Sequence, residues 1–433
     1  MKKIFLSTLL LFAVSTWMMA QQPVPAPEQT KKIALTGGIA HLGNGQVIQN
    51  SVIAFDKGKL VIVADASTRP DLTGYDEVKI TGKHVYPGFI LPNSQVGLME
   101  VSSIRAMSDN QEHGDLNPNV RALPGYNTDT EFQATFRFNG VLLAEATPTG
   151  GIISGTSSVM EMEGWNWEDA AHSIDIAVHM NWPPRMKREF DFATFSFSEN
   201  PNKDYDKTVQ QLDEFFAASK AYANQSSKAR NLKLEAMQGL FSGKKTLMLH
   251  ADNAKEIVEG VRFAQRQGVP RITVVTTTGA YLAAEFLKDN KIPVILTAVH
   301  DLPERPDDDV DMPYKQPFLL TQAGVNVSLS HEGMLAGARN LPFYAGTAVA
   351  YGMKPEEAIQ AITLNPAKAL GIEGRVGSLE VGKDASLFVS DGDILEIRVS
   401  KVSVAFIRGK LVTLPNKQEE LYERFSRKYG HIK

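Results

Sequence analysis

Two amide side chains, Asn93 and Gln95, stand two residues apart just after an apolar run that ends at Leu91. Residues two apart on an extended segment point to the same side, so we expect both amides to converge on one site. Amides hydrogen-bond to polar ligands, but they are weak ligands for zinc-type ions, which favour imidazole, thiolate and carboxylate groups. The pair therefore predicts a substrate-binding site that holds metal poorly.

A histidine and three threonines follow two other strand-like runs. His250 comes directly after residues 247–249, and Thr276, Thr277 and Thr278 end the run that begins at residue 272. In a β/α barrel the C-terminal ends of the strands face the active site. At such an end His250 is a metal ligand or general base, or it only bonds the next loop. The threonines, Thr278 among them, bind a polar ligand or cap the next helix.

A third strand-like run, residues 325–329, is followed by Ser330, His331 and Glu332. An acidic side chain at this place can accept a proton from an attacking water. Glu332 is the first candidate and His331 the alternative, because a one-residue change of register exchanges the side chain that faces inward.

Other polar residues are weaker candidates. His172 and His179 flank a segment that we expect to pack as a helix or strand. Residues 102–140 are expected to form an extended loop over the site. There Arg121 or Arg137 would grip a carboxylate in bidentate fashion or pair with an acidic neighbour.

The elements that must position these residues alternate along the middle of the chain. Strand-like runs at 246–249, 272–275, 294–296 and 325–329 alternate with helical patterns, one of them at 254–263 with Asp252 as its expected cap. Repeated strand–helix units imply a parallel sheet. In a chain of this size we expect the sheet to close into a (β/α)8 TIM-type barrel, over residues 87–370.

Both ends of the chain are rich in β-type runs and glycine turns, including a hairpin turn at residues 56–58. The pattern of residues 32–66 returns near the other end, in 377–389 and 402–410. Chain termini often lie close together. We therefore expect one small composite β-sandwich built from residues 21–86 and 371–433, so that the chain is an α/β protein of two domains.

Composition and the first residues bear on location. The 433 residues are 43% hydrophobic and 22% charged with a net charge of −4, which gives no sign of a nucleic-acid partner. Lys2 and Lys3, an apolar core and Ala20 predict a signal peptide over residues 1–20. The apolar run is short for a membrane span, and a chain without cysteine cannot carry a lipoprotein thiol. We expect an exported, periplasmic protein with no stable membrane anchor.

Several motifs occur in an order that belongs to a known family. They are Pro87-Gly88-Phe89-Ile90, His250-Ala251, Asn340-Leu341-Pro342-Phe343, Pro355-Glu356-Glu357-Ala358, Thr363-Leu364-Asn365-Pro366-Ala367-Lys368-Ala369-Leu370-Gly371 and Gly377-Ser378-Leu379-Glu380-Val381-Gly382-Lys383-Asp384-Ala385. In this order the chain resembles the amidohydrolase superfamily, and within it the imidazolonepropionase-like secreted proteins. The resemblance implies a β/α barrel with a composite β-sandwich. It also implies hydrolysis of non-peptide C–N bonds, often in cyclic amides, by a hydroxide bound to a divalent metal.

The same resemblance predicts an altered metal site. Asn93 and Gln95 stand where the family has a metal-binding His pair, and Thr277 or Thr278 stands where it has another His. His250 keeps the expected type, and Glu332 would replace the terminal Asp. One His and one carboxylate fall short of the three protein ligands typical of catalytic zinc. We expect at most one weakly held divalent metal such as zinc, with His250 as its ligand.

Three functions follow as hypotheses, of which the third is a structural exported protein with no pocket function. In the first, the protein is a non-catalytic barrel that binds a small-molecule ligand or an intact amidohydrolase partner. In the second, it is an enzyme with altered chemistry, in which His250 and Glu332 activate water while Asn93 and Gln95 orient the substrate. The resemblance makes a homodimer the default assembly, and the sequence names no substrate.

Overall fold

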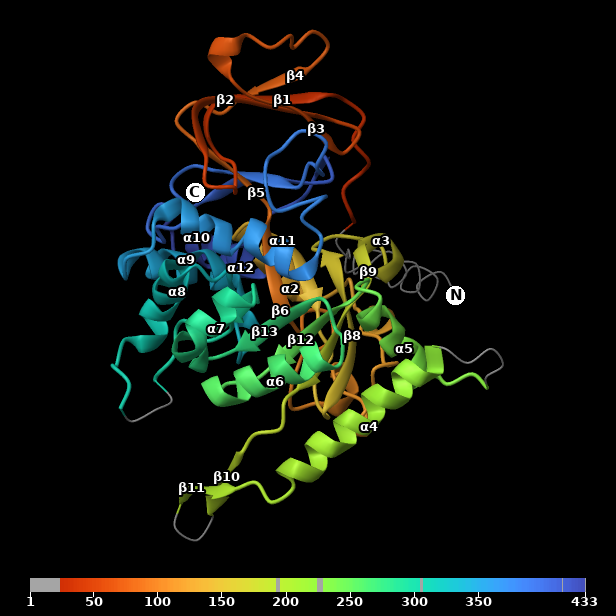
Figure 1. Ribbon diagram of the computed structural model, residues 1–433. Coiled ribbons are helices and arrows are strands. Elements are labelled where there is room, and N and C mark those ends of the chain that lie inside the picture. Colours follow the sequence, from red (N-terminus) through yellow and green to blue (C-terminus); the bar gives the residue numbers. More distant parts are fainter. Residues whose placement is uncertain (1–23, 192–194, 224–228, 304–306, 415, 433) are drawn as a thin grey trace, which may run out of the picture.

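The computed structural model describes residues 24–191, 195–223, 229–303, 307–414 and 416–432. A small β domain lies at one end of the molecule and a larger barrel at the other (Figure 1). The expected export signal falls in residues 1–20 and lies outside the described residues. In the described part of the chain, no helix is long and apolar enough to cross a membrane.

The small domain is one eight-stranded sheet that takes strands from both ends of the chain. Its order is β18-β17-β16-β5-β1-β2-β3, and β4 pairs with β1. The strands are β1 (Ile33–His41), β2 (Val47–Asp56), β3 (Lys59–Asp65), β4 (Asp76–Lys79), β5 (His84–Pro87), β16 (Leu387–Ser390), β17 (Val402–Ile407) and β18 (Lys410–Leu411). Alternate apolar side chains form a core of their own around Leu35, Ile53, Phe55 and Phe406. The expected sandwich fold is confirmed, and β2 and β3 form the expected hairpin.

The barrel also has eight strands, as predicted. They are β6 (Phe89–Ser94), β7 (Val141–Ala146), β8 (Ile153–Glu161), β9 (Ala171–Asn181), β12 (Thr246–His250), β13 (Ile272–Thr276), β14 (Val294–Leu296) and β15 (Val327–Leu329). The hydroxyl of Ser330, just after β15, donates to the Pro92 carbonyl on β6 and joins the two edges. One strand departs from the parallel pattern, because β8 runs antiparallel to both β7 and β9.

Helices cover the barrel between most of its strands. They are α2 (Glu131–Phe138), α3 (Trp167–Ala170), α4 (Tyr205–Ala223), α5 (Leu232–Phe241), α6 (Ala254–Arg266), α7 (Ala284–Asp289), α8 (Met312–Ala323), α9 (Leu341–Ala350), α10 (Pro355–Ala361) and α11 (Leu364–Leu370). Helix α6 buries Ile257 and Val261, as its apolar stripe predicts. Its cap is Asn253, whose side chain accepts from the backbone N–H of Lys255, and not Asp252 as the sequence suggested.

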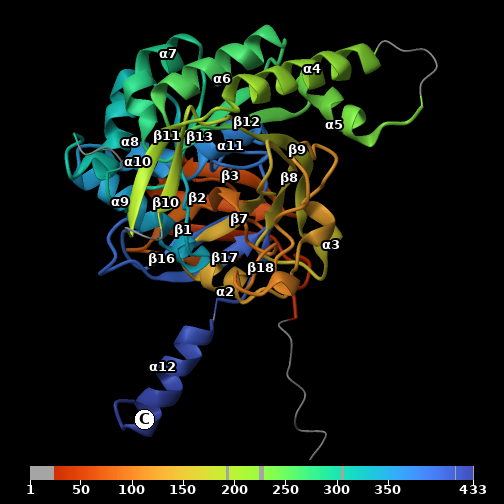
Figure 2. The same ribbon diagram turned by 90° about the horizontal axis from the view of Figure 1, so that it is seen from below.

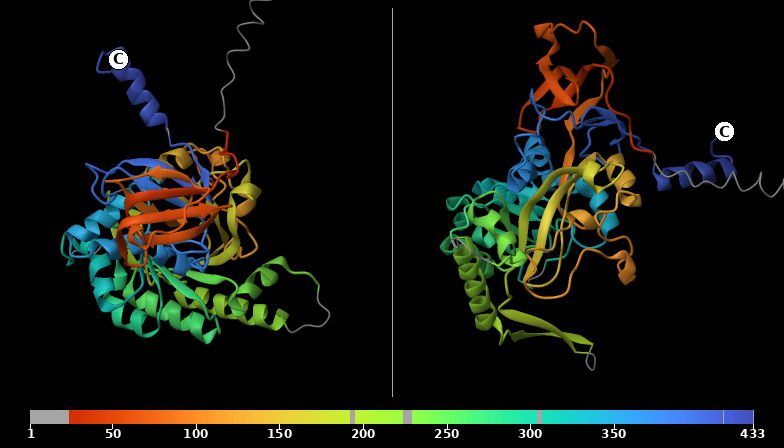
Figure 3. Two further views of the ribbon diagram at one scale, coloured as in Figure 1. Left: turned by 90° about the horizontal axis from the view of Figure 1, so that it is seen from above. Right: turned by 90° about the vertical axis from the view of Figure 1, so that its right-hand side faces the viewer.

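Two elements extend beyond this body. The antiparallel hairpin of β10 (Met186–Asp191) and β11 (Ser196–Pro201) projects from the barrel (Figure 3). Helix α12 (Lys417–Lys428) stands away from the molecule near the C-terminus (Figure 2). An ion pair between Lys417 Nζ and Glu131 Oε1, 2.9 Å apart, links the start of α12 to α2.

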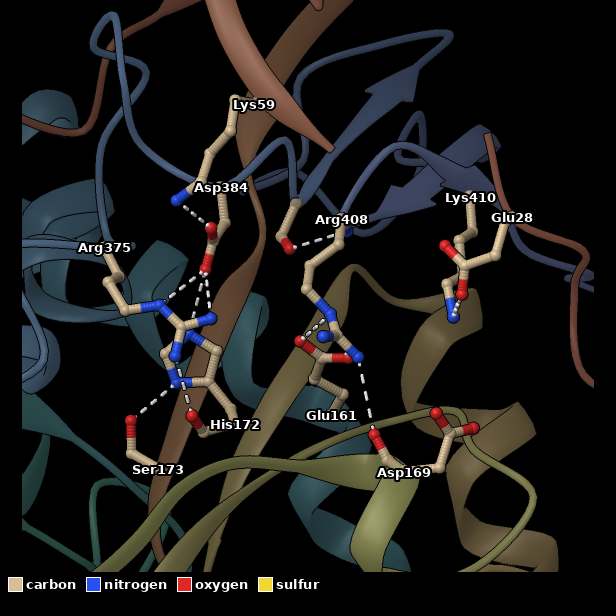
Figure 4. A network of polar contacts seen from close by, with 11 residues as sticks. Glu28, Lys59, Glu161, Asp169, His172, Ser173, Arg375, Asp384, Arg408 and Lys410 are labelled. Atoms are coloured by element: carbon tan, nitrogen blue, oxygen red, sulfur yellow. Dashed lines mark hydrogen bonds and ion pairs between the residues drawn. The ribbon is translucent and has the colours of Figure 1, made fainter. Parts of the chain in front are cut away.

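A network of ion pairs joins the small domain to the barrel (Figure 4). At its centre the Asp384 side chain, 2% exposed, binds Lys59 Nζ of β3 at 2.6 Å and Arg375 Nε at 3.0 Å. It also lies 3.2 Å from His172 Nε2 of β9. A second pair joins Arg408 Nε, in the turn after β17, to Glu161 Oε1 at the end of β8, at 2.8 Å. The closing sequence motif therefore supplies the residue that ties the two parts together.

Candidate functional site

A cavity of about 320 Å³ opens at the ends of the barrel strands. Its lining brings together five of the side chains singled out in the sequence: Asn93, Gln95, His250, His331 and Glu332. This is the size of a small-molecule site, and the lining is more polar than usual. The rule that strand ends face the site holds for these residues.

The two amides reach the cavity by an irregular path. Asn93 has φ of 51°, in the left-handed region that asparagine tolerates better than most residues, and the pairing of β6 with β7 shifts here. The continuous extended segment expected for residues 93–95 is therefore broken at Asn93. The Gln95 Oε1 atom accepts a hydrogen bond of 2.9 Å from Asn110 Nδ2, so the loop that contains Asn110 does reach the site.

A chain of contacts leads from His250, at the cavity, to two buried groups beneath it. His250 Nε2 lies 2.9 Å from His179 Nδ1 on β9, and His179 Nε2 lies 3.1 Å from Glu145 Oε1 on β7. The Glu145 and His179 side chains are 0% exposed. Glu145 also accepts from Ser157 Oγ at 2.6 Å and from the backbone N–H of Asn93 at 2.8 Å.

Sequence reasoning missed Glu145 as a site residue and ranked His179 low. Both carried a signal: Glu145 is the one charged residue in the apolar run Val141–Ala146. His179 lies near the end of a strand, as His250 does. A lone polar residue in an otherwise apolar strand marks a buried network, since an unpartnered buried charge is costly.

Electrostatics fix the charge states of this chain. Burial alone raises the pKa of Glu145, but attraction from His179 and the hydrogen bonds from His179, Ser157 and Asn93 outweigh it and hold the pKa below its ordinary value. Burial, with a smaller effect from His179, lowers the pKa of His250 to about 3. At neutral pH the carboxyl of Glu145 is therefore ionised and the ring of His250 is neutral.

His331 and Glu332, which follow β15, each have defined contacts. His331 Nε2 lies 2.9 Å from the Met334 carbonyl and Nδ1 lies 3.0 Å from Tyr344 Oη, so both ring nitrogens have partners. Burial lowers the pKa of His331. The Glu332 carboxylate accepts from Thr297 Oγ1 at 2.9 Å. Both residues line the cavity, and Glu332 supplies its acidic oxygens.

The threonines after β13 are placed differently. Thr277 donates to Asp252 Oδ1 through both its backbone N–H, at 2.7 Å, and its hydroxyl, at 2.9 Å. Thr278 is buried at the start of the 3-10 helix Gly279–Ala283, and its side chain does not cap that helix. Thr278 is not among the residues that line the cavity.

The two arginines do not reach the cavity either. Arg121 Nε pairs with Asp175 at 2.8 Å, and Arg137 Nε donates to the Thr413 carbonyl at 3.1 Å. Neither is part of the cavity lining. Bidentate binding of a ligand carboxylate, which the sequence suggested for either arginine, would therefore require a different arrangement of these side chains.

Few groups of the cavity are arranged to bind a metal. Among the residues that the structure describes, no cluster of three or more His, Cys, Asp or Glu side chains could hold a metal ion. His179 uses both ring nitrogens within the buried chain, and His250 uses one. The cavity lining includes His250, Glu332 and the two amides, Asn93 and Gln95.

Comparison with known proteins identifies the family. A sequence model described as "Amidohydrolase family" matches residues 130–414. Imidazolonepropionase of Thermoplasma volcanium is 34% identical over 119 residues, which are 26% of this chain and 30% of that protein. Imidazolonepropionase of Shewanella frigidimarina is 26% identical over 226 residues, 52% of this chain and 48% of that protein. The matched stretches thus span less than half of either relative.

Solved structures agree on the fold. An amidohydrolase from Thermotoga maritima superposes with a TM-score of 0.76 at 23% identity, over 88% of this chain and 99% of that one. The fold and the resemblance read from the motifs are both confirmed. Since the family model covers well over half of the sequence, this chain belongs to the amidohydrolase family.

Proposed function

We propose that the barrel mouth binds a small polar ligand of the class that this family hydrolyses, a cyclic amide or related compound with a non-peptide C–N bond. We further propose that it does so without a zinc-type ion, so that metal-dependent hydrolysis is lost. The observation that carries the proposal is the 2.9 Å contact between His250 Nε2 and His179 Nδ1, because it occupies ring nitrogens that a metal would need.

The chemistry of the donors supports this proposal. A catalytic zinc site takes three protein ligands with lone pairs directed at one point. Asn93 and Gln95 supply amide oxygens, which are poor zinc ligands, and Gln95 already accepts from Asn110. The donor set does not fit a zinc-type ion, but amides, hydroxyls and an imidazole are well suited to hydrogen-bond a neutral polar molecule.

Metal analysis tests the proposal directly. After dialysis of the mature protein against a mild chelator, we expect elemental analysis to find zinc, manganese and iron far below one ion per chain. Added zinc is then expected to leave the melting temperature unchanged, because only a bound ligand stabilises the folded state. Near-stoichiometric metal, or a clear rise in melting temperature with zinc, would contradict the proposed loss.

Metal-independent hydrolysis is the second candidate function. The chain of contacts from His250 to His179 and from His179 to Glu145 favours it, since such a chain can orient a general base. The pKa of about 3 argues against it, because a group with so low a pKa is a weak base at neutral pH. Turnover of a cyclic amide that is unchanged by chelator, and lost in His250→Ala, would support this second function.

Location and assembly complete the proposal. We propose an exported, periplasmic protein on the basis of residues 1–20, and a homodimer or a complex with an intact amidohydrolase as its assembly. Fractionation of the native host would test the location. Light scattering of the purified protein, together with mass spectrometry of co-purifying chains, would separate the two assemblies.

A further inference from the structure

We propose that the mouth of the cavity is an apolar subsite, so that the ligand is a cyclic amide that carries an apolar substituent such as an alkyl chain. The ring binds among the polar groups at the floor of the cavity, and the substituent lies along the loops at its rim. This inference rests on the proposed ligand-binding function and adds to it the class of substituent that the site selects.

Polar and apolar residues of the lining lie at different depths. Asn93, Asn181 and His250 line the cavity from within a barrel strand or from its last residue, and therefore form the floor. Met99 and Leu335 also line the cavity, but they lie in the loops beyond β6 and β15. Because these loops build up from the strand ends, the two apolar side chains lie nearer to the mouth.

Met334 extends this apolar surface beyond the cavity. It lies between Gly333 and Leu335, which both line the cavity, and its side chain is 80% exposed. Its backbone is fixed, because the Met334 carbonyl accepts from the Gly337 N–H at 2.8 Å and lies 2.9 Å from His331 Nε2. A flexible thioether side chain that is held at the rim in this way can fold over an apolar group of a ligand.

The loop that follows Met99 carries further exposed apolar side chains. Val101 is 41% exposed and Ile104 is 46% exposed. The base of this loop is fixed, since the Met99 N–H donates to the Gln95 carbonyl at 3.1 Å and Met99 pairs with Ser108. Single exposed apolar residues are ordinary on a protein surface, but a group of them beside a cavity indicates a binding site.

The size of the cavity indicates what covers this surface. A volume of about 320 Å³ is at the small end of the range for ligand sites, so a cyclic amide with a chain of several carbons extends past the mouth. The chain then covers Leu335 and Met334 and removes apolar surface from water. Each methylene that is buried in this way is expected to raise the affinity about threefold.

The test uses the full-length mature protein and a series of lactams, with binding measured by calorimetry. The series is 2-pyrrolidinone and its derivatives with a methyl, propyl or pentyl chain on the ring carbon next to the nitrogen. We expect one site per chain and a roughly 100-fold rise in affinity from the methyl to the pentyl compound. In Met334→Ser this rise is expected to fall below about tenfold, while the affinity for 2-pyrrolidinone stays the same.

Leu411→Ser is the matched control, because Leu411 is also an exposed apolar residue, 59% accessible, but lies on β18 of the small domain. It is expected to keep the wild-type rise, whereas Met99→Ser is expected to reduce it as Met334→Ser does.

Three results would overturn the inference. If the lactams bound but their affinity did not rise with chain length, the subsite would be wrong and the proposed ligand class would stand. If no lactam bound, 2-pyrrolidinone included, the proposed function and the subsite would both be wrong. A rise that stayed equally steep in Met334→Ser and Met99→Ser would place the chain on another surface.

Discussion

Exchange of Asp384 for asparagine is expected to lower the free energy of unfolding by about 2–4 kcal/mol. The substitution keeps the shape of the side chain and removes its charge from contact with Lys59, Arg375 and His172. Removal of one partner from a fully buried ion pair costs about 3–5 kcal/mol. The expected cost is somewhat smaller here, since the side chains of Lys59 and Arg375 are 48% and 44% exposed and can turn to water.

Chemical denaturation followed by circular dichroism measures this cost, and Asp391→Asn is the matched control. Asp391 pairs with Lys83 at 2.7 Å, but both side chains are 38% exposed. An exposed pair contributes about 0–1 kcal/mol. Equal losses in the two variants would show that burial of Asp384 does not strengthen the junction.

The effect of Asp384 should also depend on pH. Burial alone raises its pKa, but the hydrogen bonds from His172 and Lys59 and the charges of Arg375 and Lys59 hold the pKa well below its ordinary value. A carboxyl with a lowered pKa in the folded state stabilises that state fully above its unfolded pKa of about 3.9 and loses the effect as pH falls further. The difference in the free energy of unfolding between the wild type and Asp384→Asn is therefore expected to have its full size at neutral pH and to become smaller below about pH 4.

Most of the architecture could be predicted from the sequence, because the periodic patterns that mark strands and helices are local. Runs such as residues 272–275 and 325–329 could be assigned from a few neighbours, and the β-rich ends gave the sandwich. The reversed direction of β8 was not accessible in this way. The direction of a strand depends on the path of the chain that connects it to its neighbours. In residues 147–182 the sequence shows no strand–helix repeat from which the direction of β8 could be predicted.

The site was only partly predictable for a related reason. His250 and the two amides follow from the rule that strand ends face the cavity. The contacts of His250 cross long distances in sequence, from His250 to His179 and from there to Glu145. No local pattern states which buried polar groups meet, so Glu145 and the role of His179 emerged only from the packed structure.

Replacement of His179 by leucine is expected to lower the free energy of unfolding by about 3–5 kcal/mol. Leucine fits the apolar surroundings, but it removes the imidazole that faces Glu145 Oε1 and leaves a carboxylate that is 0% exposed without that hydrogen-bond partner. Urea denaturation of the wild type and variant gives the difference. A loss below about 1 kcal/mol would mean that water or another group replaces the imidazole.

A double-mutant cycle of Glu145 and His179 tests whether the two residues stabilise the fold as a unit. Glu145→Gln is expected to destabilise the wild type by about 1 kcal/mol, because it weakens a charge-assisted hydrogen bond. In the His179→Leu background the same change should stabilise the fold by about 1–2 kcal/mol, since it removes the uncompensated charge. Such a reversal of sign would show that the two residues act as a unit. A buried carboxylate of this kind is seldom the most stable filling for a barrel core. Its presence directly beneath His250 then argues that Glu145 and His179 serve what the cavity binds.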